Sequence, residues 1–178
     1  MPPPNNTHPQ YPKGEYCDTL YDVTGQIVWQ TPWRSNLIVN GLSRLLAALV
    51  KGDEAGDALA FWAVGIGNSD WDTGTNLPNE DERRNFTTLV NETGRKAIDP
   101  NDIVFFPSGS LSNQIEISVQ FTSADVASDA PEDRQLREFG LFAGGTTSRG
   151  TGRLINHRIH ARIDLEDAPL ERVLRLTF

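Results

Sequence analysis

The sequence has little cysteine, no long apolar run and no excess of basic residues. Cys17 is the single cysteine among 178 residues, which excludes an internal disulfide and a site built from several thiolates. No stretch approaches the roughly 18 apolar residues of a membrane-spanning helix. Asp and Glu outnumber Lys and Arg by 24 to 16, for a formal net charge of −8. Since nucleic acids and anionic membranes attract cationic proteins, we expect neither nucleic-acid binding nor membrane insertion.

The composition favours one β-rich domain with many turns. Hydrophobic residues make up 38% of the chain, and 15 Gly and 11 Pro indicate frequent loops. Residues 1–20 begin with a Pro- and Asn-rich stretch that has almost no apolar content, and we predict an extended N-terminal arm there. Residues 21–178 are expected to form a single domain. The first residues lack the basic and apolar regions of a secretory leader, so synthesis and folding in the cytoplasm are expected.

Hydrophobic periodicity predicts one helix and several strands. The helix begins near Asn40, and four leucines at helical spacing give it one apolar face: Leu42, Leu45, Leu46 and Leu49. The expected strands include Phe61–Ile66, Asn113–Thr122, Leu136–Phe142, Arg153–Asp164 and Arg172–Phe178. The strand over 113–122 alternates most regularly, with isoleucine, valine and phenylalanine on one face. The predicted fold class is α+β, mainly β: an antiparallel, sandwich-like sheet with one amphipathic helix packed on it.

Glu138 stands out because it interrupts an apolar strand, in the segment LREFGLFAGG. A carboxylate in this position can be a catalytic acid, a metal ligand or a structural charge with a buried partner. Arginines are frequent in the last strands, and an arginine opposite a carboxylate is a common cross-strand pair. We therefore predict a structural ion pair between Glu138 and Arg158 or Arg175 that fixes the register of the strands.

Metal and cofactor sites are not indicated. The loop with Asn68, Asp70, Asp72 and Asn76 resembles a calcium loop, but it lacks the central glycine and the final bidentate carboxylate. His157 and His160 are three residues apart on a predicted strand, so they point to opposite faces and cannot share one ion. No nucleophile elbow, phosphate loop or dinucleotide fingerprint is present, and no catalytic residue and no cofactor are predicted.

Tryptophans leave a carbohydrate-binding function open. Trp71 could stack on a sugar ring while Asp70 and Asp72 accept hydrogen bonds from its hydroxyl groups. Trp33 and Trp62 are interpreted instead as core or interface residues. A receptor-recognition module is thus an alternative function.

Six segments together resemble a known family: NLIVNGLSRLLAAL, FWAVGIGNS, TLVNETGRK, NQIEISVQF, LREFGLFAGG and GRLINHRIHARIDLEDAPLERVLRLTF. Their order is similar to that of the N-terminal globular domain of phage tail-collar and tail-fibre proteins. It also resembles small baseplate and fibre components of contractile injection systems. The similarity extends over residues 36–178. The chain ends without the repetitive shaft of a long fibre protein.

The resemblance implies a structural virion protein and not an enzyme. It implies an assembly adaptor in the tail, made in the bacterial host cytoplasm, that attaches fibres or spikes to the baseplate. It also implies a homo-oligomer, often a trimer, with other tail, baseplate or fibre proteins as partners. A head or neck decoration protein is the remaining alternative, because such proteins are also small, acidic and β-rich.

Overall fold

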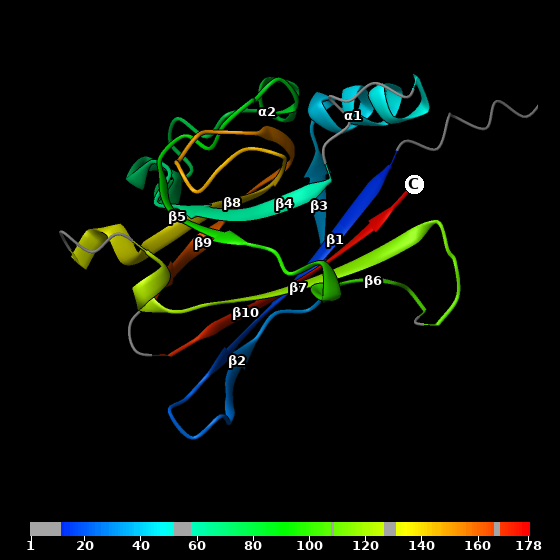
Figure 1. Ribbon diagram of the computed structural model, residues 1–178. Coiled ribbons are helices and arrows are strands. Elements are labelled where there is room, and N and C mark those ends of the chain that lie inside the picture. Colours follow the sequence, from blue (N-terminus) through cyan, green and yellow to red (C-terminus); the bar gives the residue numbers. More distant parts are fainter. Residues whose placement is uncertain (1–11, 52–57, 108, 127–130, 166–167) are drawn as a thin grey trace, which may run out of the picture.

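The computed structural model contains ten strands and two short α-helices (Figure 1), and it describes residues 12–51, 58–107, 109–126, 131–165 and 168–178. The strands are β1 (Lys13–Tyr21), β2 (Ile27–Gln30), β3 (Arg34–Ile38), β4 (Leu59–Gly65), β5 (Glu92–Ala97), β6 (Ile103–Phe105), β7 (Gln114–Phe121), β8 (Gln135–Ala143), β9 (Arg153–Asp164) and β10 (Leu170–Thr177). The helices are α1 (Asn40–Lys51) and α2 (Glu80–Arg84), with short 3-10 turns at Ser69–Thr73, Pro100–Asp102, Ser123–Asp125 and Pro131–Arg134.

All strand pairs are antiparallel and form one curled sheet. The order is β5-β4-β8-β9-β3-β1-β10-β7-β6, and β2 pairs with β1 beside β3. The curl brings the two ends of the sheet together: Gly94 of β5 forms an isolated bridge with Val126, and Lys96 Nζ donates to the Gln120 carbonyl at 2.8 Å. The predicted class, mainly antiparallel β with a packed helix, is confirmed.

β1 corrects the predicted arm. Residues 13–20 do not form a separate extended arm; they lie in the middle of the sheet, paired with β10 along one edge and with β2 and β3 along the other. Apolar burial holds β1 within the sheet, because Tyr16 is fully buried and Cys17 is only 8% exposed. This stretch therefore contributes residues to the core. The rest of the predicted arm, residues 1–11, lies outside the described part of the chain.

The helix α1 has the predicted span and packs against β9. Leu42 and Leu45 are 2% and 5% exposed, whereas Leu49 near the helix end is 51% exposed. The helix approaches the sheet closely at Gly41, where a Cβ atom would lie 1.9 Å from the Leu154 carbonyl oxygen. No larger residue fits there without moving the helix.

The main core lies inside the curl of the sheet. On β7, Ile117, Val119 and Phe121 are buried as the alternation predicts. Trp62 is fully buried and its ring lies 5.8 Å from that of Phe139, which confirms its interpretation as a core residue. These contacts fix how the sheet curls around its apolar face.

A second, smaller cluster lies on the opposite face of β4 and β8, because neighbouring residues of a strand point to opposite sides. Its buried members are Val39, Ala63, Leu89, Phe142 and Leu154, with Phe86 packed against them. Phe86 and Leu89 belong to the segment between α2 and β5, which therefore covers this face. Glu138 lies beneath the same segment.

Candidate functional site

Glu138 is fully buried and accepts three hydrogen bonds. The backbone N–H groups of Val90 and Asn91 donate to its two carboxylate oxygens at 3.0 and 2.7 Å. His157 Nε2 lies 2.9 Å from Oε2, and this ring is also fully buried, with Phe86 packed 5.1 Å from it. Glu138 thus fastens the covering segment to the sheet.

The predicted arginine partners of Glu138 are wrong. In the β8–β9 ladder Arg158 stands opposite Phe139, so it leaves the sheet on the other face from Glu138. Its Nε donates to the Tyr16 hydroxyl at 3.3 Å. The register of β8 against β9 is irregular between Leu136 and Glu138, and hydropathy alone does not report strand register.

Arg175 forms the predicted kind of pair with a different carboxylate. It stands opposite Glu116 on β7, and its Nε donates to Glu116 Oε2 at 2.8 Å. The guanidinium lies between the rings of Trp33 and Phe106, 4.0 and 3.9 Å from their centroids. Trp33, at 40% exposed, therefore forms part of a half-buried cation–π stack near the surface.

Two more arginine–carboxylate pairs are buried in the sheet. Arg172 is fully buried, binds Asp18 through two nitrogens, and stacks 3.9 Å from the Phe139 ring. Burial and the Arg172 charge lower the pKa of His160 to about 3. The neutral imidazole donates from Nδ1 to the Ala161 carbonyl at 2.7 Å, and its Nε2 lies 3.4 Å from an Arg172 nitrogen.

The second buried pair joins Arg95 to Glu92. Arg95 Nη1 also donates to the Thr151 carbonyl at 2.7 Å, and Glu92 Oε2 accepts from the Gly150 N–H at 3.0 Å. Arg95 stacks over Phe142 at 4.3 Å. This pair holds the glycine-rich turn between β8 and β9 against β5, which is a structural task.

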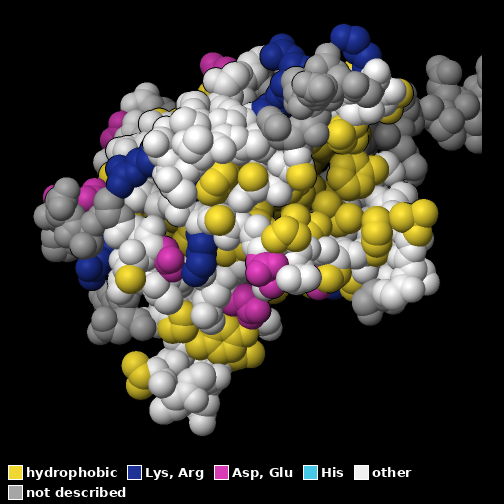
Figure 2. All heavy atoms as spheres, in the orientation of Figure 1, with side chains coloured by type: hydrophobic (Ala, Val, Ile, Leu, Met, Phe, Trp, Pro, Cys, Tyr) yellow, Lys and Arg dark blue, Asp and Glu magenta, His cyan; other side chains and the backbone are white. Residues whose placement is uncertain are grey.

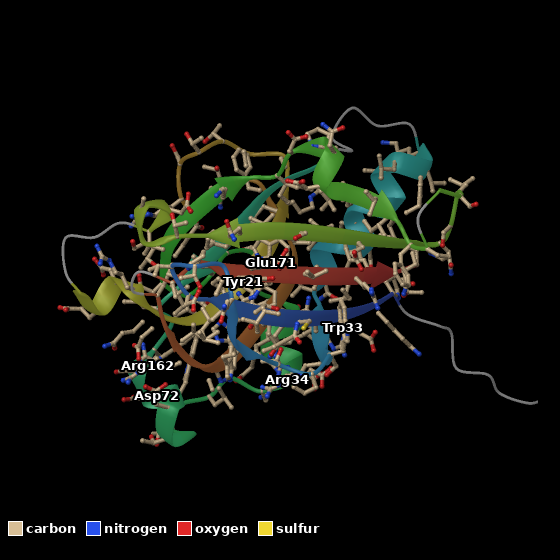
Figure 3. All side chains as sticks on the ribbon, turned by 90° about the horizontal axis from the view of Figure 1, so that it is seen from below. Tyr21, Trp33, Arg34, Asp72, Arg162 and Glu171 are labelled. Atoms are coloured by element: carbon tan, nitrogen blue, oxygen red, sulfur yellow. The ribbon has the colours of Figure 1, made fainter. Side chains whose placement is uncertain are left out.

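The polar groups of the proposed sugar-binding loop are engaged within the protein. Both oxygens of Asp72 accept from Arg137, at 2.9 and 2.7 Å, and this contact lowers the pKa of the Asp72 carboxyl. Trp71 Nε1 donates to the Asn76 carbonyl at 3.1 Å, and Asp70 Oδ2 accepts from the Asn76 amide. Figure 3, a view from below, shows Asp72 near Arg162.

The ring of Trp71 lies against Gly67, where a Cβ would meet it at 2.1 Å. The loop therefore needs glycine at position 67, which has a positive φ of 55°. Glycan contact by Trp71, Asp70 and Asp72 remains a prediction that would compete with these internal bonds.

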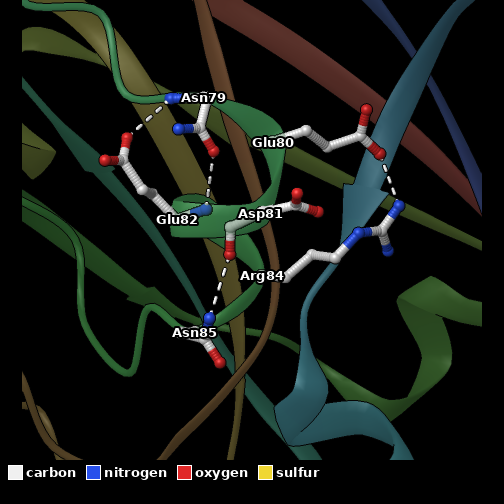
Figure 4. Close-up of a pocket in the computed structure, with 6 residues that line it drawn as sticks. All are labelled: Asn79, Glu80, Asp81, Glu82, Arg84 and Asn85. Atoms are coloured by element: carbon white, nitrogen blue, oxygen red, sulfur yellow. Dashed lines mark hydrogen bonds and ion pairs between the residues drawn. The ribbon is translucent and has the colours of Figure 1, made fainter.

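A shallow acidic hollow lies on α2 (Figure 4). Its polar groups close the ends of this short helix: Asn79 and Glu82 form a reciprocal capping box, Arg84 pairs with Glu80, and Asn85 donates to the Asp81 carbonyl. Within the described ranges, no group of three or more His, Cys, Asp or Glu side chains is placed to hold a metal ion.

The hairpin of β1 and β2 exposes apolar side chains to solvent. All four residues of β2 are exposed, and Ile27, Val28 and Trp29 are 56%, 59% and 42% exposed. Figure 1 shows the hairpin projecting below the body of the sheet, and Figure 2 shows apolar side chains gathered on it. In the described part of the chain β2 pairs with β1 alone, so its outer edge carries free backbone groups.

The sequence contains a turn pattern that indicates this hairpin, although the hairpin was not among the predicted elements. Asp22 and Gly25 form its turn: Asp22 Oδ1 accepts from the Thr24 hydroxyl and from the Thr24 and Gln26 N–H groups, and Gly25 has a φ of 81°. The Thr24 hydroxyl and the Gln26 N–H lower the pKa of the Asp22 carboxyl. An Asp–x–x–Gly turn between two extended apolar stretches predicts a hairpin.

No protein-family model, curated protein or solved structure matches the chain. The α-helices within the described residues are too short to cross a membrane.

Proposed function

We propose that the chain is a structural assembly protein that acts through protein contacts and has no catalytic step. It would serve as an adaptor in the tail of a phage or phage-like particle, as its resemblance to tail-collar and tail-fibre domains implies. In this role it would form a homo-oligomer and attach fibres or spikes to the baseplate.

The observation that carries the proposal is the apolar hairpin of β1 and β2. An exposed strand with free edge groups and apolar side chains is a docking or aggregation site, and proteins that stay monomeric protect such edges with charge or proline. None of the residues of β2 is charged. We infer that β2 pairs with, or packs on, a neighbouring protein subunit in the assembled tail.

The surroundings of the hairpin support the proposal. A stable subunit contact buries about 800 Å² per partner, more than one four-residue strand supplies. Trp33 follows β2 closely in the chain and is 40% exposed over Arg175, which adds an aromatic group to the contact surface. Aromatic residues and arginine are enriched at the energetic centres of interfaces.

The experiment compares Val28→Glu with Val50→Glu. Val50 is 90% exposed at the end of α1, so it provides the same substitution on a different surface. Light scattering after size exclusion should show a defined oligomer for the wild type and for Val50→Glu, and a smaller species for Val28→Glu. Circular dichroism should be the same for all three proteins.

Purified particles provide the second measurement. Wild type and Val50→Glu should be incorporated, and Val28→Glu should be lost from the particles. A wild-type protein that is strictly monomeric at high concentration and absent from purified particles would refute the proposal.

A further inference from the structure

A groove of about 990 Å³ opens between α2, β3 and the start of β1. Its charged lining consists of Lys13, Arg83, Arg84 and Arg158, with Glu15 and Glu80 as the carboxylates. The lining has four cationic and two anionic side chains, whereas acidic residues outnumber basic ones in the whole chain, whose net charge is −8. The groove is thus a basic site on an acidic protein.

A second hollow of about 280 Å³ extends the first. The two share Asn40 and Arg84, and the second adds Arg44 and Arg153 without any Asp or Glu in its lining. We call the two hollows together the basic groove. In Figure 2, Lys and Arg side chains gather along the upper edge of the molecule, above α1.

Two of the arginines lack a carboxylate partner. Glu80 is already paired with Arg84, and Arg158 donates to the neutral Tyr16 hydroxyl. Among the described residues no ion pair includes Arg83 or Arg158. Burial is the largest cause that lowers the pKa of Arg83, and the positive charge of Arg158 is the next. The Nε atom of Arg83 is also buried without a hydrogen-bond acceptor. A bound anion would relieve both effects.

Asn36 supplies an independent indication of a ligand. The residue is among those that line the groove, it is 7% exposed, and both Nδ2 and Oδ1 are buried without a partner. A buried amide without hydrogen bonds is costly, so such groups usually have partners. Asn36 needs both an acceptor and a donor, and the main-chain amide of a peptide offers both.

We propose that the basic groove binds an acidic peptide segment of a partner protein, with Arg83 and Arg158 on its carboxylates and Asn36 on one of its main-chain amides. Guanidinium groups match carboxylates geometrically and form strong, charge-assisted hydrogen bonds. Because the basic groove extends over two adjoining hollows, it suits a peptide chain better than a single ion.

Other occupants fit the groove less well. Single-stranded nucleic acid needs aromatic platforms for base stacking, and Phe86 is the one aromatic residue in the two linings. The chain's own residues 1–11 contain no Asp or Glu, so they offer no side-chain carboxylate to the arginines. The proposal does not depend on the assembly function, because it concerns a different surface from the β2 hairpin.

The test titrates the protein with the capped peptide acetyl-Gly-Asp-Glu-Asp-Gly-amide. NMR should show saturable shifts of the Asn36 side-chain amide and of Arg83 Nε, weakening as salt is raised. The neutral counterpart acetyl-Gly-Asn-Gln-Asn-Gly-amide should bind at least about tenfold more weakly, as should Arg83→Gln toward the acidic peptide. Arg34→Gln is the matched control, since Arg34 is exposed on β3 outside the groove and should leave binding unchanged.

Asn36→Leu separates binding from folding. Because the amide has no partner in the free protein, removing it should leave stability equal or higher while peptide affinity falls. The Val28→Glu protein should bind the peptide as the wild type does, so failure of the assembly proposal would leave this result standing.

Three outcomes would overturn the proposal. One is the absence of any saturable shift up to about 10 mM acidic peptide, where even weak recognition is visible. Another is inorganic phosphate binding as tightly as the peptide, which would indicate a simple oxyanion site. The third is an oligothymidylate binding more tightly than the peptide, which would indicate a general polyanion surface.

Discussion

Replacing Glu138 by glutamine tests whether this carboxylate is the fastening point of the covering segment. The substitution keeps the shape of the side chain but replaces one of two acceptor oxygens by an NH₂ donor. In the structure both oxygens face donors, since the N–H groups of Val90 and Asn91 and the His157 ring surround them. Whichever way the amide turns, at least one donor then faces another donor.

The expected cost is about 3 kcal/mol of unfolding free energy. A hydrogen bond to a charged group contributes roughly 1.5–3 kcal/mol, and a buried donor left without an acceptor costs about 1–3 kcal/mol. Glu138 is fully buried, so water cannot replace the lost bond. Because a domain of this size has a total stability of about 5–15 kcal/mol, the loss is a large part of it.

Urea unfolding followed by tryptophan fluorescence measures the effect. We expect a lower midpoint with an unchanged slope, and faster hydrogen exchange at the Val90 and Asn91 amides. Glu116→Gln is the matched control, because Glu116 is also a carboxylate within the sheet, but its partner is Arg175 and its side chain is 27% exposed. Exposed pairs contribute about 0–1 kcal/mol.

Two results would refute the reasoning. The first is a Glu138→Gln protein within about 0.5 kcal/mol of the wild type, the range of ordinary surface substitutions. The second is an equal loss in Glu116→Gln. The first would mean that the covering segment is held by apolar contacts alone, and the second would mean that burial does not set the cost of the substitution.

Two further predictions concern His160 and Cys17. His160 has a folded-state pKa of about 3 against 6.5 when unfolded, so the unfolded state binds the extra proton and stability falls as pH drops from about 6.5 toward 3. At pH 5 the loss relative to His160→Gln should be about 2 kcal/mol by urea titration, and a pH-independent difference between the two proteins would contradict this account. Cys17 is 8% exposed and donates to the Thr31 carbonyl at 3.1 Å, and burial raises the pKa of its thiol. It should react with a thiol reagent only as fast as the protein opens, and rapid labelling of the native protein would show that β1 is not held as the structure shows.

Strand and helix positions could be predicted from the sequence because they depend on local periodicity. The alternation in 113–122 gave β7, and the leucines after Asn40 gave α1, since each pattern puts apolar residues on one face. The same reasoning did not predict β1. The proline-rich beginning of the chain indicated an extended arm, although the residues around Tyr16 belong to the core.

The partners of Glu138, Arg158 and Arg175 could not be predicted in this way. Strand register decides which side chains face each other, as for Arg158 opposite Phe139 and Arg175 opposite Glu116, and it follows from the packing of several strands at once. The basic groove was equally hidden, since it joins Lys13, Asn36, Arg83 and Arg158 from three strands and a helix. No local pattern links these residues.

By itself the sequence determined an acidic, mainly antiparallel β domain with one amphipathic helix, because composition and periodicity act residue by residue. The tertiary structure alone decided that Glu138 binds backbone amides and His157, and that Arg175 pairs with Glu116. It also decided that four cations meet in one groove. These outcomes depend on register and curl, which arise only when the whole sheet closes around its core.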